Sequence, residues 1–155
     1  MTGSEPAGVH PAWLPPEAFR AVGARRTAVY GTGRLVETVV AEVAQACDRY
    51  GGAVRHHGAP GPAAPGGPAD LVLALTDAEG LPPAAAAIRA ELRRSAPQEG
   101  SLGLEGYALA RRDGVTVVLA DAGAVLLYGL FHVVRRGAAA FGADHPVHRH
   151  RPALP

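Results

Sequence analysis

Apolar positions between residues 32 and 50 recur at spacings of three and four. This period predicts an amphipathic helix that begins at an N-cap, Thr32, and ends near Tyr50. The residues that form its apolar face are Leu35, Val36, Val39, Val40, Val43 and Cys47.

Short runs of β-branched and aliphatic residues elsewhere predict strands. Three of them precede the middle of the chain: "RTAVYG" (26–31), "GGAVRHH" (51–57) and "DLVLAL" (70–75). Two more, 105–114 and 115–120, form a predicted hairpin with Asp113 and Gly114 in its turn.

Two further helices are predicted over 82–95 and over 123–137. The second, "GAVLLYGLFHVVRRG", follows Asp121 and has thirteen uncharged residues before Arg135. A membrane-spanning helix needs about 20 apolar residues, so we expect a core helix instead. Its buried residues are predicted to be Leu127, Leu130, Phe131 and Val134. Gly129 is expected to mark a close backbone contact. His132 is expected to be a core or interface residue whose ring nitrogens have hydrogen-bond partners.

The resulting order, β-α-(β)-β-α-β-β-α, predicts a single α/β (α+β) domain: a mixed β-sheet with helices packed mainly on one face. We assign residues 1–14 to a flexible N-terminal segment, 15–143 to the domain, and 144–155 to a solvated tail rich in His, Arg and Pro. The stretch 58–69 is predicted to be a flexible or extended loop.

The composition excludes several classes of function. The 155 residues carry a net charge of +1; the chain has no lysine, its arginines are scattered, and aromatic residues make up 5%. We therefore expect neither a basic surface for the phosphates of a nucleic acid nor a set of aromatic side chains on which bases could stack. Cys47 is the single cysteine and is predicted to be a buried, inert thiol. The first twenty residues lack the pattern of a secretory signal, so we expect a cytoplasmic protein without a membrane anchor.

The sequence "YGTGR" (30–34), between a predicted strand and helix, invites comparison with dinucleotide-binding loops. Those loops need a third glycine for close packing of helix on strand, and Val36 stands at that position. They also need an acidic residue about 20 positions further on, where this chain has "RHH". We expect a glycine turn and no bound nucleotide cofactor.

The other histidines are not expected to bind metal. His145, His148 and His150 lie without cysteines or a nearby acidic cluster, which makes a poor zinc site. His56 and His57 are adjacent and would point to opposite faces of a strand.

One long segment nevertheless resembles a known family. It is "EGYALARRDGVTVVLADAGAVLLYGLFHVVRRG", whose pattern is carried by Glu105, Gly106, Tyr107, Gly114, Val115, Gly123, Tyr128 and Gly129. It resembles the end of the domain that precedes the catalytic barrel in several glycoside hydrolases. The version "LLYGLFHVVR", with Phe131 and His132, is most similar to the N-terminal domain of glycoside hydrolase family 67, the xylan α-glucuronidases. The β-hexosaminidases carry a similar domain.

The resemblance spans residues 10–145, and "PAWLPP", with Trp13 and Leu14, is similar to that family's early Trp-Leu segment. It implies a fold like domain 2 of β-hexosaminidases. The arginine bias, the Pro-rich loop and the "HPVHRHRP" tail depart from the family, and the Asn-His-Trp-Asp stretch that opens its barrel is not found.

The two carboxylates of such enzymes lie at the mouth of a barrel of about 250 residues. No catalytic, cofactor-binding or metal-binding residue of the family can therefore be assigned here. The resemblance implies an isolated or truncated accessory domain, inactive by itself, whose partners are a catalytic barrel and xylan-derived oligosaccharides. The alternative is a stand-alone carbohydrate-binding or protein-interaction module.

Overall fold

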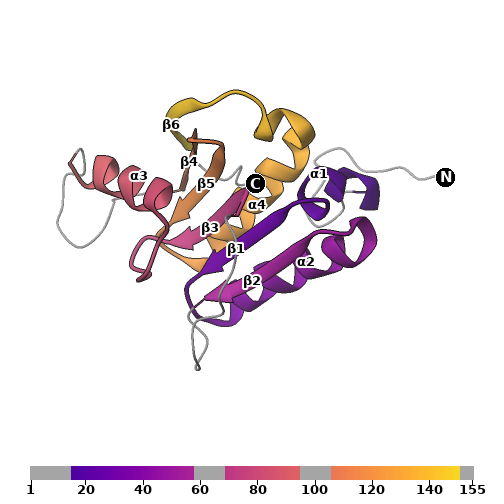
Figure 1. Cartoon of the computed structure of the whole chain (residues 1–155). Coiled ribbons are helices and arrows are strands. Elements are labelled where there is room, and N and C mark those ends of the chain that lie inside the picture. The colour runs from indigo at the N-terminus through magenta and orange to yellow at the C-terminus, as the bar shows by residue number, and fades with distance from the viewer. Residues whose placement is uncertain (1–14, 58–68, 95–105, 151–155) are drawn as a thin grey trace.

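The protein forms a six-stranded sheet with helices on both faces (Figure 1). The structure is a computed structural model, and it describes residues 15–57, 69–94 and 106–150. The strands are β1 (Arg26–Tyr30), β2 (Ala53–His57), β3 (Leu71–Leu75), β4 (Tyr107–Arg112), β5 (Val115–Ala120) and β6 (His145–His150). The helices are η2 (Pro16–Phe19), α1 (Arg20–Gly23), α2 (Arg34–Tyr50), α3 (Pro83–Arg94), α4 (Gly123–Arg136) and η3 (Gly137–Phe141).

The strand order is β2-β1-β3-β5-β4-β6. Strands β2, β1, β3 and β5 run parallel, and β4 is antiparallel to both β5 and β6. The sheet is therefore mixed, and the predicted α/β class is confirmed. The hairpin of β4 and β5 also forms as predicted, with Asp113 and Gly114 in its turn at positive φ.

Alternate strand residues point into two separate cores, as expected from the two-residue period of a strand. The larger core lies beneath α1, α2, α4 and η3 and includes Val29, Leu73, Leu109 and Val118. The smaller core lies beneath α3 and includes Val72, Leu119 and Ile88. Helices therefore pack mainly on one face, as predicted, and α3 covers the other face (Figure 1).

The start of α2 differs from the prediction. Gly33, with φ of 122°, is the N-cap, and no side chain bonds the free amides there, so Thr32 is not the cap. Glycine reaches this φ without steric cost, which explains why the chain turns one residue later than expected.

Helix α4 packs its apolar residues on the sheet. Leu126, Leu130 and Val133 are fully buried, and Phe131 and Val134 are nearly so. Leu127 was predicted to be buried but is only half-buried, because the helix is rotated so that Leu126 takes the central position.

The turn of η3 extends α4 to a helical segment of 19 residues, Gly123–Phe141, with a mean hydropathy of 1.2. Within the described ranges it is the one segment that is long and apolar enough to cross a membrane. In this fold it is the central helix of the larger core.

The predicted solvated tail is wrong over six residues. His145–His150 form β6, which pairs antiparallel with β4 and becomes an edge of the sheet. The run "HPVHRH" has no alternating apolar pattern, and only Val147 of it packs against the smaller core, so pairing with β4 is the main contact that places this strand. The predicted N-terminal segment (1–14), most of the 58–69 loop, Trp13, Leu14 and Glu105 lie outside the described residues.

Candidate functional site

The parallel strands β2, β1, β3 and β5 end together at one edge of the sheet. The chain passes from β1 outward to β2 and returns to β3 on the other side of β1, which places a topological switch point between β1 and β3. In open α/β sheets, ligands bind outside the carboxyl ends of strands at such a point. The residues there are Gly31, His57, Thr76 and Asp121, which we call the carboxyl-edge site.

The loop after β1 is shaped by glycine. Gly31 has φ of 134°, and a Cβ at this position would lie 2.8 Å from Cγ of Leu75. Val36, the residue in place of a third fingerprint glycine, is buried in the larger core, and a Cβ on Gly123 at the start of α4 would lie 3.4 Å from its Cγ2. The N-termini of α2 and α4 therefore lie against one another, and the loop serves to pack these two helices.

The two adjacent histidines lie on opposite faces of β2, as predicted. Nε2 of His56 lies 2.7 Å from the carbonyl oxygen of Gly31. The ring of His57 stacks on that of Tyr30, with centroids 4.4 Å apart and planes 7° apart. Burial, together with the neighbouring Arg55 and His56, lowers the pKa of His57. Each histidine thus has its own contact to β1 or to the loop after it, which sequence reasoning did not foresee.

Thr76 and Asp121 join the ends of β3 and β5. The Thr76 hydroxyl donates to Oδ1 of Asp121 at 2.6 Å, and the Thr76 amide donates to the carbonyl of Ala120 at 2.9 Å. From α3, Arg89 donates to the carbonyl of Ala78 at 2.6 Å. These contacts tie the loop after β3 to its neighbours, so this polar group holds the carboxyl edge together.

A second polar pair lies beneath α4. The Tyr107 hydroxyl is 2.7 Å from Nδ1 of His132, and the two rings meet edge to face. Burial raises the pKa of Tyr107, which favours the neutral phenol as a hydrogen-bond partner of the imidazole. His132 is thus a satisfied residue of the helix–sheet interface, as predicted.

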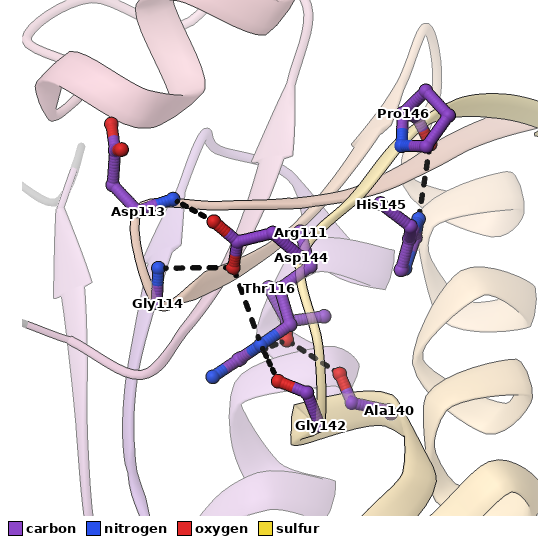
Figure 2. A network of polar contacts seen from close by, with 9 residues as sticks. All are labelled: Arg111, Asp113, Gly114, Thr116, Ala140, Gly142, Asp144, His145 and Pro146. Carbon is purple, nitrogen blue, oxygen red and sulfur yellow. Dashed lines mark hydrogen bonds and ion pairs between the residues drawn. The ribbon is translucent and has the colours of Figure 1, made fainter.

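The third polar group fastens the β4–β5 hairpin to the segment between η3 and β6 (Figure 2). Arg111 donates through Nε to the carbonyl of Gly142 and through Nη1 to Oγ1 of Thr116, both at 2.8 Å. The buried Thr116 hydroxyl in turn donates to the carbonyl of Ala140 at 2.7 Å. Asp144 forms an ion pair with Arg111, with its Oδ1 3.8 Å from Nε.

Asp144 also completes the hairpin turn (Figure 2). Its carboxylate accepts the amides of Asp113 at 2.8 Å and Gly114 at 3.3 Å. The side chains of Arg111, Thr116 and Asp144 bond main-chain carbonyls and amides, so this network holds two segments of backbone together. We therefore assign it a structural role. It also explains why the chain after η3 returns along β4 to form β6.

No group of three His, Cys, Asp or Glu side chains in the described part of the chain is arranged to hold a metal ion. The rings of His145 and His148 lie 5.7 Å apart between centroids, on the edge strand. Cys47, on the buried face of α2, lies in the larger core, as predicted, and burial raises the pKa of its thiol, with Asp48 adding to the effect.

Sequence reasoning missed the carboxyl-edge contacts and the Arg111 network. A signal for the first existed, since Thr76 and Asp121 each directly follow a buried strand. The second joins residues up to 31 positions apart, which no local pattern indicates.

Comparisons with known proteins add no family: no family model matches the chain, and no curated protein matches it.

Proposed function

We propose that this chain is the N-terminal accessory domain of an α-glucuronidase-like glycoside hydrolase, which packs against a catalytic barrel and carries no catalysis of its own. The proposal rests on the resemblance of the 105–137 segment and on the place that its residues take in the fold.

The observation that carries the proposal is the contact between Gly129 and the hairpin. A Cβ on Gly129 would lie 2.4 Å from Cγ1 of Val118 and 3.4 Å from the ring of Tyr107. Two residues of the family-like pattern, Tyr107 and Gly129, therefore meet at one point of the helix–sheet interface. These two residues of the family-like pattern hold the last helix on the sheet. Residues that serve packing rather than chemistry are what we expect in an accessory domain.

The other pattern residues also act in packing and turns. Gly123 at the start of α4 faces α2, where a Cβ would lie 3.1 Å from Cβ of Leu35. Gly114 has φ of 77° in the hairpin turn, a conformation that favours glycine. Tyr128 packs against the larger core from the half-exposed side of α4.

A protein-interaction module is the second candidate. Binding to sugar rings would favour exposed aromatic side chains, but Tyr30, Tyr107, Phe131 and Phe141 are buried. An open pocket at the amino edge of the sheet, lined by Arg20, Arg25, Arg135 and Glu17, supports an interaction surface instead.

The coding sequence around this chain tests the proposal. We expect the reading frame beyond Pro155, or the adjacent frame, to encode a (β/α)₈ barrel of about 250 residues. Co-expression of that barrel with this chain should give a complex that survives gel filtration. A neighbourhood without any barrel-encoding frame, or a barrel that elutes separately from this chain, would contradict the proposal.

A further inference from the structure

The pairing of β6 with β4 contains one irregular step, which decides the faces that two histidines occupy. Leu109 and Arg111 of β4 are the register partners of His148 and His145. Two residues of β6 therefore lie opposite a single residue of β4, which is the arrangement of a β-bulge. In a regular strand, residues three apart point to opposite faces. Across the bulge, His145 and His148 instead share the face of Leu109, which is the face of the larger core.

The two imidazoles lie close together on this face. Their ring centroids are 5.7 Å apart and their planes are tilted by 39°. Two imidazoles that share a zinc ion, through bonds of about 2.0–2.1 Å, have ring centroids about 5–6 Å apart. The separation found here therefore suits a single ion between the rings. His148 is exposed, so its ring can turn toward an ion without a change in the backbone.

The proton of the His145 ring is placed by a neighbouring carbonyl (Figure 2). Nδ1 of His145 lies 3.0 Å from the carbonyl oxygen of Pro146, and because a carbonyl can only accept, Nδ1 carries the proton. In the neutral ring Nε2 then presents a lone pair, which is the form that binds a metal ion. A hydrogen bond from the second ring nitrogen to a carbonyl is also how proteins orient metal-ligating histidines.

The Nε2 atom of His145 is buried and has no hydrogen-bond partner among the described residues. Only the Thr27 hydroxyl shares this condition among the buried side-chain nitrogens and oxygens of the described ranges. Buried polar atoms are nearly always paired, so an atom of this kind calls for a water or an ion as its partner. Unlike a threonine hydroxyl, a neutral imidazole nitrogen is a common metal ligand.

We propose that His145 and His148 form a binding site for a divalent first-row transition-metal ion on the edge strand β6. Imidazole suits zinc, copper and nickel, whereas magnesium and calcium prefer oxygen ligands. No third His, Cys, Asp or Glu side chain of the described residues joins the pair, so water completes the coordination of the ion. This distinguishes the pair from a structural zinc site, in which the protein supplies all four ligands. The site goes beyond the proposed function and does not depend on it.

The test is a calorimetric titration of the full chain with ZnCl₂ at neutral pH, and we expect one saturable site per chain. Since the loss of even an outer partner of a metal ligand costs about 10–100-fold in affinity, His145→Gln and His148→Gln should each weaken zinc binding by at least about tenfold. The double variant should be little weaker than either single variant, because both side chains hold the same ion. MgCl₂ should show no saturable binding.

His56→Gln is the matched control, since His56 lies on the other edge strand, β2, and bonds the carbonyl of Gly31, to which a glutamine can also donate. This variant should bind zinc as the parent does. NMR of the imidazole nitrogens identifies the ligating atom: zinc should shift Nε2 of His145 and leave Nδ1 protonated.

The absence of saturable zinc binding would overturn the proposal. Zinc on Nδ1 of His145, or an equal loss of affinity in His56→Gln, would overturn it as well. Because His148 is exposed, His148→Gln tests the pair even if His145→Gln does not fold. An unchanged affinity in His148→Gln would show that the ion binds elsewhere and would likewise contradict the site.

Discussion

Gly129 of α4 approaches Val118 of β5 so closely that a Cβ would lie 2.4 Å from Cγ1 of Val118. In a helix, Gly→Ala normally stabilises by about 1 kcal/mol. Here we expect Gly129→Ala to lower the free energy of unfolding by about 1–3 kcal/mol through overpacking, measured by urea denaturation.

The control is a double-mutant cycle with Val118→Ala, which removes the obstructing methyl groups. The Gly129→Ala substitution should be less destabilising in that background. A stabilised Gly129→Ala variant would show that α4 does not touch the sheet at this point.

Leu130 and Leu127 lie on the same helix but differ in burial. Leu130→Ala should destabilise by about 2–5 kcal/mol, because a fully buried side chain leaves a cavity. Leu127→Ala, at a half-buried position, should be clearly less destabilising. Thermal melts of the two variants decide this, and a Leu130→Ala variant that melts within a degree of the parent would mean that α4 is not the core helix.

Two threonines on the same face of the sheet offer a matched pair. The buried Thr27 hydroxyl has no hydrogen-bond partner among the described residues, whereas that of Thr116 has two. Since an unsatisfied buried polar group costs about 1–3 kcal/mol, Thr27→Val should stabilise the protein. Thr116→Val should destabilise it, because Arg111 and the carbonyl of Ala140 each lose a bond.

Chemical denaturation of the two valine variants at neutral pH measures both effects. If Thr27→Val also destabilised the protein, the Thr27 hydroxyl would have a hydrogen-bond partner, and the prediction would be contradicted.

The Tyr107–His132 pair predicts a pH dependence. Burial raises the pKa of Tyr107 in the folded state above its unfolded value of about 10. Above that pH the unfolded chain releases a proton that the folded chain keeps, so the stability from this group is present below pH 10 and is lost as pH rises through the folded pKa. Tyr107→Phe should be less stable than the parent at pH 7 by about 1 kcal/mol.

The difference between Tyr107→Phe and the parent should narrow above pH 10. Urea denaturation at pH 7 and at alkaline pH measures it, and a difference that stays constant would contradict a buried, neutral phenol in the folded state.

The parts of the fold with a strong hydrophobic period were predictable. Helix α2, the apolar strand β3 and the Asp113-Gly114 hairpin follow from local pattern and turn chemistry alone. Even the close approach at Gly129 was expected, because glycine inside a helix is unfavourable unless space requires it.

Strand β6 was not predictable, because its histidines and proline carry no strand period and its position depends on pairing with β4. The same holds for the polar contacts of the site. Thr76 and Asp121 lie 45 positions apart and meet only because β3 and β5 are neighbours in the sheet.

The most direct test of an accessory domain is activity of the purified chain alone on aldouronic acids. We predict no release of 4-O-methylglucuronic acid above a buffer blank, because the chain resembles only the domain that precedes the barrel. Release that survives repurification and disappears when one carboxylate of this chain is replaced by its amide would contradict it.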